Sequence, residues 1–281
     1  MIALRPSVAR GWLRSEDDPR EAMMQPTDPG RVARTDVISA IALVLIALLV
    51  QLVGSGKPWL DLPVTATFTR PPEAPVRSTA EFTLAETSVP IATVHLPSAV
   101  AVLLLFSALM RLLWLVPGIR SRRVAALDAG RHLARWIEYS QVGGVVAFLV
   151  AQLNGITEVT SLVPIYALGA GVALLLVLHD RRTTPGRAGL WAFSFGAAIG
   201  VVPWGVIAFA QIGGTLAGVG VSVLVRVVTV AALLGLAAVW TVAWAFGRGE
   251  RGRAIAVRED RMLSFTVPLS ALVLAVYVLV G

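Results

Sequence analysis

Long apolar stretches alternate with short polar segments along this chain, and that pattern predicts its elements. Seven stretches reach about 17 residues or more, enough at the helical rise to cross the roughly 30 Å hydrocarbon core of a bilayer. They lie near residues 37–53, 98–116, 136–153, 162–178, 190–211, 218–246 and 262–280. Because backbone amides in lipid must pair within their own segment, we predict an all-α membrane protein, a bundle of seven transmembrane helices.

Segment 55–96, between the first two spans, has a different pattern. Residues alternate in character over Val64–Thr69 and over Ala80–Leu84, on either side of a Pro-rich turn that includes Arg70-Pro71-Pro72. Such alternation around a turn is typical of a β-hairpin. An isolated hairpin is only marginally stable in water, so we expect this one to pack on the bundle or on a second copy of the chain.

The distribution of positive charge predicts the orientation of the bundle. Nineteen of the 24 Lys and Arg residues lie in segments 1–36, 117–135, 180–189 and 247–261, whereas segment 55–96 carries three. By the positive-inside rule, the N-terminus is cytoplasmic, and the hairpin and the C-terminus are extracellular. We expect the protein in the plasma membrane. We predict a disordered cytoplasmic tail over residues 1–36 and a single seven-helix domain over 37–281.

Composition excludes several classes of protein. Hydrophobic residues make up 56% of the chain and charged residues 15%, and the mean hydropathy of +0.77 is far from that of a soluble domain. The net charge of +7 lies in short loops without interleaved aromatic residues. We therefore expect the lipid bilayer, and not nucleic acid, as the partner of these charges. The chain has no cysteine, so it has no thiol or disulfide chemistry.

The sharpest local signal is a carboxylate, Glu138, inside the apolar third span, in the run Arg135-Trp136-Ile137-Glu138-Tyr139-Ser140. An ionised group at membrane depth is costly, so Glu138 requires a partner. In one interpretation it is hydrated near the interface and pairs with Arg135. In the other it is buried and pairs with Arg111, which lies at a comparable depth in the second span but could instead snorkel. Arg226, in the sixth span, is expected to snorkel outward in the opposite leaflet.

Small residues and prolines in the spans predict helix packing. Gly143-Gly144 in the third span and the pair Gly196 and Gly200 in the fifth favour close approach of neighbouring helices. Pro203 and Pro268 each remove a backbone hydrogen bond and should kink their helices. Trp204 either lines a cavity or fills core volume.

Catalysis and transport find little support in the sequence. His95, His132 and His179 fall near predicted helix ends or in loops, and no metal or nucleophile constellation accompanies them. We therefore expect neither an enzyme nor a metal site. Ion or proton transport is a weaker alternative, because it requires a series of ionisable groups through the bundle, and the predicted spans offer almost none besides Glu138, Arg111 and Arg226.

Taken together, these residues resemble the heliorhodopsins, seven-helix retinal proteins with inverted termini. Arg135–Ser140 is similar to the family's third-helix motif, whose glutamate is the counterion of the retinal Schiff base. The runs at 151–158 and 199–204, and the Ser-Ala-Leu triplets at 107–109 and 270–272, agree as well. The resemblance implies a homodimer, a signalling function, and a chromophore pocket lined by Tyr139, Ser140, Gly143, Pro203, Trp204, Pro268 and Ser270.

One departure from the family changes the expected chemistry. In the family, the residue directly before the seventh-helix Ser-Ala-Leu is the lysine that binds retinal, and here it is Leu269. The only lysine in the chain, Lys57, lies outside every predicted span. An imine requires a primary amine, which the guanidinium of arginine cannot replace, so we predict no covalent chromophore. We hypothesise that Arg111 supplies the positive charge that the Schiff base would place beside Glu138.

These observations favour a sensory or regulatory membrane protein that acts through a cytoplasmic or membrane protein partner and holds retinal at most non-covalently. The rival hypothesis is a binding module for a lipid or a small apolar ligand, a polyene included, in the vacated pocket. Leu269 is expected to fill part of that space. A continuous cavity beside Leu269 and Glu138, or a closed core there, would separate the two hypotheses.

Overall fold

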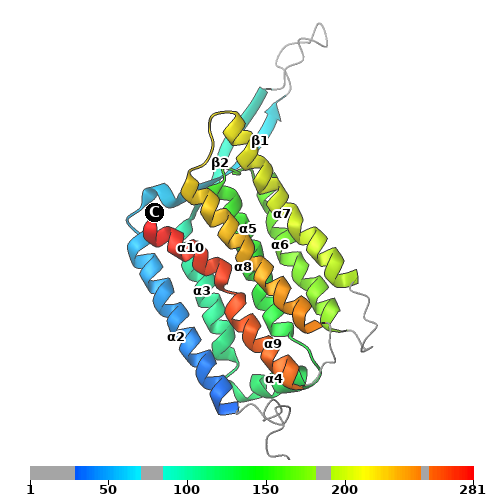
Figure 1. Cartoon of the computed structure of the whole chain (residues 1–281). Coiled ribbons are helices and arrows are strands. Elements are labelled where there is room, and N and C mark those ends of the chain that lie inside the picture. The colour runs from blue at the N-terminus through cyan, green and yellow to red at the C-terminus, as the bar shows by residue number, and fades with distance from the viewer. Residues whose placement is uncertain (1–28, 71–84, 182–190, 248–252) are drawn as a thin grey trace, which may run out of the picture.

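The computed structural model describes residues 29–70, 85–181, 191–247 and 253–281. Its helices run side by side in a bundle, from one end of which a two-stranded sheet projects, while α4 lies at the opposite end beside α9 (Figure 1). The helices are α2 (Pro29–Gly54), α3 (Leu96–Leu113), α4 (Pro117–Asp128), α5 (Leu133–Leu153), α6 (Val159–Asp180), α7 (Trp191–Leu216), α8 (Val223–Gly247), α9 (Arg253–Thr266) and α10 (Leu269–Val280), with a short 3-10 helix at Pro58–Leu60.

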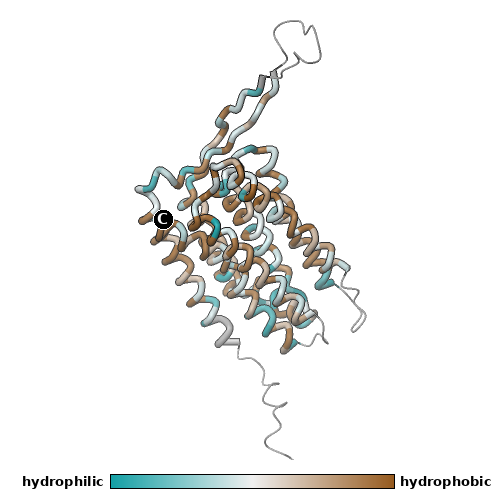
Figure 2. The backbone as a smooth tube through the Cα atoms, turned by 45° about the horizontal axis from the view of Figure 1, so that its top comes forward, coloured by the Kyte–Doolittle hydropathy of each residue, from teal (hydrophilic) through white to brown (hydrophobic). Residues whose placement is uncertain are grey.

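Six helical segments of the described chain are long and apolar enough to cross a membrane. They are Arg34–Gly54, Leu96–Leu113, Val159–Asp180, Trp191–Leu216, Val223–Gly247 and Arg253–Val280. Apolar residues dominate these segments, and hydrophilic residues gather toward their ends (Figure 2). Helix α5 has 21 residues, which is also a sufficient length, but its charged and polar residues lower its hydropathy. It packs against α3, α6, α8 and α9, and most of its residues are buried.

Three boundaries differ from the predictions. Helix α2 begins at Pro29, inside the stretch predicted as a disordered tail, and residues 1–28 lie outside the described chain. Helix α4 forms within segment 117–135, which was expected to be a loop. The sixth span begins at Val223 and not at residue 218, because Gly218 adopts a φ of 76° and ends α7 with the Val219 amide bonded to the Gly214 carbonyl at 2.8 Å.

The two prolines have different effects. Pro268 interrupts the last predicted span, since α9 ends at Thr266 and α10 begins at Leu269. Its ring nitrogen has no hydrogen to donate to the preceding turn, which explains the break. Pro203 lies inside α7, and that helix continues through it to Leu216.

The sheet is fastened to the bundle by its first strand. Strand β1 (Asp61–Arg70) pairs antiparallel with β2 (Ala85–His95), and the predicted second segment, Ala80–Leu84, lies outside the described residues. On the other side of β1, the Thr65 amide donates to the Thr157 carbonyl at 2.8 Å. Glu158 accepts hydrogen bonds from the Thr67 amide at 2.8 Å and the Thr67 hydroxyl at 2.9 Å. The loop between α5 and α6 therefore holds the sheet in place.

Candidate functional site

Glu138 lies on the inward face of α5, near its N-terminal end, and its side chain is completely buried. Its Oε1 accepts a hydrogen bond from Arg111 at 2.7 Å, and its Oε2 accepts one from Arg135 at 3.0 Å. The interpretation of a hydrated Glu138 is wrong, because the surrounding helices exclude water. The pairing with Arg135 and the pairing with Arg111 both exist, so one buried carboxylate faces two cations.

Arg111 connects α3 to α9 as well as to α5. Its side chain is 1% exposed, so it does not snorkel to the interface. Its Nη1 also donates to the Ser107 carbonyl one turn earlier, at 2.6 Å, and its Nη2 donates to the Ser264 carbonyl of α9. Both terminal nitrogens of the guanidinium are therefore bonded inside the protein, which fixes the position of its charge beside Glu138.

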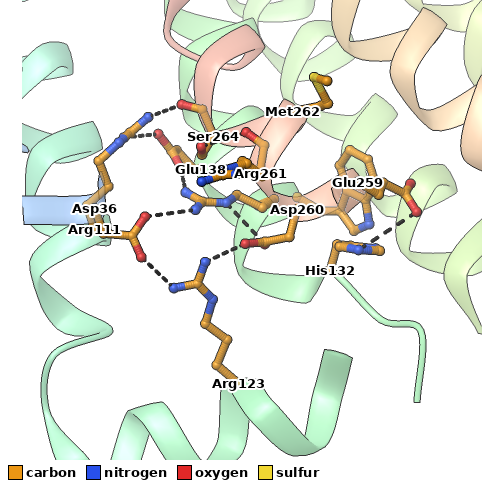
Figure 3. Close-up of polar contacts among 12 residues, drawn as sticks. Asp36, Arg111, Arg123, His132, Glu138, Glu259, Asp260, Arg261, Met262 and Ser264 are labelled. Carbon is orange, nitrogen blue, oxygen red and sulfur yellow. Dashed lines mark hydrogen bonds and ion pairs between the residues drawn. The ribbon is translucent and has the colours of Figure 1, made fainter. Parts of the chain in front are cut away.

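Arg135 extends the cluster toward α2 and α9. Its Nε donates to Asp260 at 3.2 Å, and its Nη2 lies 3.7 Å from an Asp36 carboxylate oxygen. Arg123, from α4, closes the arrangement by donating to Asp36 at 2.8 Å and to Asp260. Figure 3 shows Asp36, Arg123 and Asp260 converging from separate helices.

We call this set the buried charge cluster, and its members are Asp36, Arg111, Arg123, Arg135, Glu138 and Asp260. Three guanidinium groups meet three carboxylates, so these six groups carry no net formal charge. They come from α2, α3, α4, α5 and α9. Burying a charge is costly unless it is paired and hydrogen-bonded. The cluster therefore connects five helices through ion pairs that share charged groups with one another.

His132 precedes α5 and adjoins the cluster. Its Nδ1 lies 3.4 Å from Asp180 of α6 and its Nε2 lies 3.8 Å from Glu259 of α9, and its Nε2 also contacts the Ala256 carbonyl at 3.0 Å. Burial lowers the pKa of His132, but the hydrogen bond with Asp180 and the charges of Glu259 and Asp180 outweigh it and raise the pKa to about 9. The imidazole is therefore protonated at neutral pH.

An aromatic group packs between α5, α7 and α8. Tyr139 is buried, and its hydroxyl accepts a hydrogen bond of 2.8 Å from Nε1 of Trp240 on α8. The Trp240 ring lies 4.8 Å from the ring of Phe193 on α7. A Cβ added at Gly196 would lie 2.5 Å from the Trp240 ring, so this glycine makes room for the indole. Side chains therefore occupy the space between α5, α7 and α8.

Close contacts between neighbouring helices leave little free space at several glycines of the bundle interior. A Cβ at Gly235 of α8 would lie 3.0 Å from the Ser270 backbone nitrogen of α10. A Cβ at Gly143 would lie 3.3 Å from the Gly169 carbonyl oxygen of α6 and 3.9 Å from a methyl of Leu236. The glycines in α5 therefore serve helix packing, as predicted, and Gly143 does not open onto free space.

The seventh-helix residues do not all face inward. Ser270 and Pro268 are buried, but Leu269 is 42% exposed on the outer surface. The expectation that Leu269 fills part of the pocket is wrong, because its side chain points away from the core and Ser270 takes the inward position. Among the other predicted pocket residues, Pro203 is buried and Ser140 and Trp204 are half-buried.

Lys57 lies at the other end of the bundle from Glu138. Its Nζ donates to the carbonyl of Val278, near the C-terminal end of α10, at 2.9 Å. Ser264, whose carbonyl binds Arg111 beside Glu138, precedes Val278 by 14 residues, or about 21 Å of helix. Arg226 is also outside the cluster, since it is exposed and donates to Thr215 at 2.9 Å.

Sequence reasoning missed half of the buried charge cluster. Asp36 was assigned to a disordered tail, Arg123 to a loop, and Asp260 was taken as part of the segment preceding the last span. A signal existed in each case, because each charged residue lies within two turns of a predicted apolar span. What the sequence does not contain is the long-range contact that brings them together.

Comparisons with known proteins support the resemblance in the sequence. The model of the family described as Heliorhodopsin matches residues 32–242 of this chain, three quarters of its length. A search of curated proteins finds no match. The family match includes Arg111 and Glu138 and ends before Leu269.

Proposed function

This chain belongs to the heliorhodopsin family, and from that premise we propose that it is a sensory or regulatory membrane protein that has lost covalent chromophore binding. The proposal includes α5 as a seventh transmembrane helix. It also includes an orientation with the N-terminus in the cytoplasm and the C-terminus outside the plasma membrane. The charge distribution between the two ends of the bundle supports that orientation.

The observation that carries the proposal is the position of Lys57. It is the only lysine of the chain, and its amine is hydrogen-bonded to the Val278 carbonyl at the end of the bundle remote from Glu138. A retinal imine in the core requires a neutral primary amine in the core. A guanidinium group cannot replace the primary amine, and nitrogens of Arg111 and Arg135 are already engaged with the Glu138 carboxylate.

The pairing of Arg111 with Glu138 also supports the proposal that covalent chromophore binding has been lost. In the resembled family the glutamate at this position balances a protonated Schiff base. Here the fixed cation at 2.7 Å from Glu138 is a guanidinium. We infer that the permanent charge of Arg111 takes the place of the Schiff-base charge, which depends on a chromophore. The buried charge cluster therefore stays neutral in the absence of retinal.

The proposal also includes a signalling role through contacts with other proteins. The buried charge cluster links α2, α3, α5 and α9 with α4, which lies at the proposed cytoplasmic end. A rearrangement of the cluster would therefore move a surface helix. We include a homodimer and a cytoplasmic or membrane protein partner in the proposal on the strength of the family alone.

The rival is a lipid or small-ligand binding module in the vacated pocket. Contacts of Tyr139 with Trp240 and of Gly235 with Ser270 weigh against it, since they occupy space between α5, α8 and α10. Ion transport is disfavoured by the arrangement of charge, because the ionisable groups buried in the described helices gather at one end. We propose no enzymatic activity.

Addition of all-trans retinal to the purified protein tests the proposal. We expect no red-shifted absorbance band and no retinyl adduct on the protein after treatment with borohydride. An unshifted band that stays with the protein after free retinal is removed would indicate non-covalent binding and would favour the rival. A red-shifted band that borohydride bleaches would refute the proposal, and its loss in Lys57→Arg would assign the adduct to Lys57.

A further inference from the structure

Charges of opposite sign are separated at the end of the bundle that carries α4. The carboxylates of Asp36, Asp180, Glu259 and Asp260 are buried there. The exposed charges of the described chain at this end are mostly arginines, among them Arg120, Arg122, Arg131, Arg258 and Arg261. Asp128 is exposed but pairs with Arg253 at 3.1 Å. The described part of this surface is therefore strongly positive.

A surface pocket of about 390 Å³ lies between the end of α3 and the first turns of α4. It is lined by Leu115, Pro117, Arg120, Ser121 and Val124. Leu115 and Val124 are 40% and 38% exposed, which is unfavourable for apolar side chains in water. The pocket thus combines apolar walls with a cation, and it lies directly after the residue at which the apolar helix α3 ends.

Helix α4 is held firmly in position beside this pocket. Arg123, on a different face of the helix, pairs with Asp36 and Asp260 of the buried charge cluster. Its guanidinium also lies 4.9 Å from the centre of the Trp114 ring, at the end of α3. These contacts leave Arg120 and Val124, one turn apart, free to face an external ligand.

We propose that this pocket binds an anionic phospholipid of the adjacent leaflet. The guanidinium of Arg120 pairs with the phosphate, and Leu115, Pro117 and Val124 contact the glycerol and the first methylene groups. Arginine suits this role because its planar group binds phosphate through two hydrogen bonds. A lipid fits better than a free phosphate, since only a lipid offers apolar atoms to Leu115 and Val124. The proposal rests on the proposed orientation, because anionic lipids concentrate in the cytoplasmic leaflet.

Native mass spectrometry of the detergent-purified protein with added lipid tests this site. We expect wild type to retain palmitoyl-oleoyl phosphatidylglycerol in preference to phosphatidylcholine with the same chains. Loss of one arginine–phosphate contact corresponds to about a fivefold loss of affinity, so Arg120→Gln should reduce the preference by about that factor. Val124→Asn should also weaken retention, because it replaces an apolar wall with an amide.

Arg226→Gln is the matched control, since it removes an exposed arginine at the opposite end of the bundle, and it should retain the lipid as wild type does. Equal retention of the two lipids by wild type, or unchanged preference in Arg120→Gln, would overturn the proposal. Full retention in Val124→Asn, or displacement of the lipid by millimolar inorganic phosphate, would show a free-anion site instead. A retinylidene adduct would refute the proposed function and leave these lipid measurements unchanged.

Discussion

Arg111 donates a hydrogen bond of 2.7 Å to Glu138, and neither side chain is more than 1% exposed. The two residues lie on different helices, 27 positions apart in the chain. Their contact places a fixed cation beside Glu138 in the core of the bundle. It also makes the stability of the bundle sensitive to any change at either residue.

Glu138→Gln should strongly destabilise the purified protein. The substitution keeps the size of the side chain but leaves Arg111 and Arg135 as buried cations without that counter-charge, which costs about 3–5 kcal/mol. Thermal unfolding followed by circular dichroism should show a clear decrease in Tm. Arg226→Gln, at an exposed site, should change stability by only about 0.5 kcal/mol or less. An unchanged Tm in Glu138→Gln would contradict the pairing.

His132 should make stability depend on alkaline pH. Its pKa rises from 6.5 to about 9 in the folded protein, where it faces Asp180 and Glu259, with Asp260 nearby. The folded state therefore binds this proton more tightly than the unfolded state. The resulting stabilisation is fully present below pH 6.5 and is lost as the pH rises through about 9.

The measurement is Tm as a function of pH from 6 to 10 for wild type and His132→Gln. Wild type should lose stability over this range, and the variant should show a flatter profile with a lower Tm at pH 6. Parallel profiles in the two proteins would assign the pH dependence to other groups.

Gly235→Ala should destabilise the bundle because the added methyl would meet the backbone of Ser270 at 3.0 Å. Backbone atoms cannot rotate away, so α8 and α10 would have to separate, at a cost of about 1–3 kcal/mol. Gly171→Ala in α6 is the matched control, since nothing lies within 4 Å of its Cβ position. Chemical denaturation in detergent compares the two, and equal stability would show that the interior is less closed than these contacts indicate.

Glu158→Gln should loosen the sheet from the bundle. The carboxylate accepts hydrogen bonds from Thr65 and Thr67 of β1, and the Thr67 amide holds the pKa of Glu158 below its usual value. The amide replaces one acceptor oxygen with a donor and removes the charge. Hydrogen exchange at the Thr67 amide should accelerate. Glu86→Gln, on β2, is the control, and equal exchange rates in both variants would exclude a docking role for Glu158.

Much of the fold was predictable because its causes are local. Apolar stretches long enough to cross a bilayer must become helices in lipid, whatever surrounds them, and six of the predicted spans meet that condition in the described chain. Helix α5 was predicted from its length despite its polar residues. Helix α4 was missed, because the whole charged segment 117–135 was interpreted as a loop between two spans, although arginine and alanine favour helices.

The candidate site was predictable only in part. The depth of Arg111 and Glu138 in their spans placed them close to each other, and that contact is present. The sequence left the choice between Arg111 and Arg135 open because both satisfy the same requirement for a cation. The structure shows both, and it adds Asp36, Arg123 and Asp260, whose contacts join distant parts of the chain.

The sequence by itself determined the chemistry of this protein: a single lysine outside the spans, a carboxylate inside one of them, and helices of bilayer length. These are properties of residue types and their order, so no packing can alter them. Tertiary structure alone decided that Glu138 faces two guanidinium groups and that Leu269 points outward while Ser270 points inward. The rotation and register of each helix depend on the packing of all the others, which no local pattern encodes.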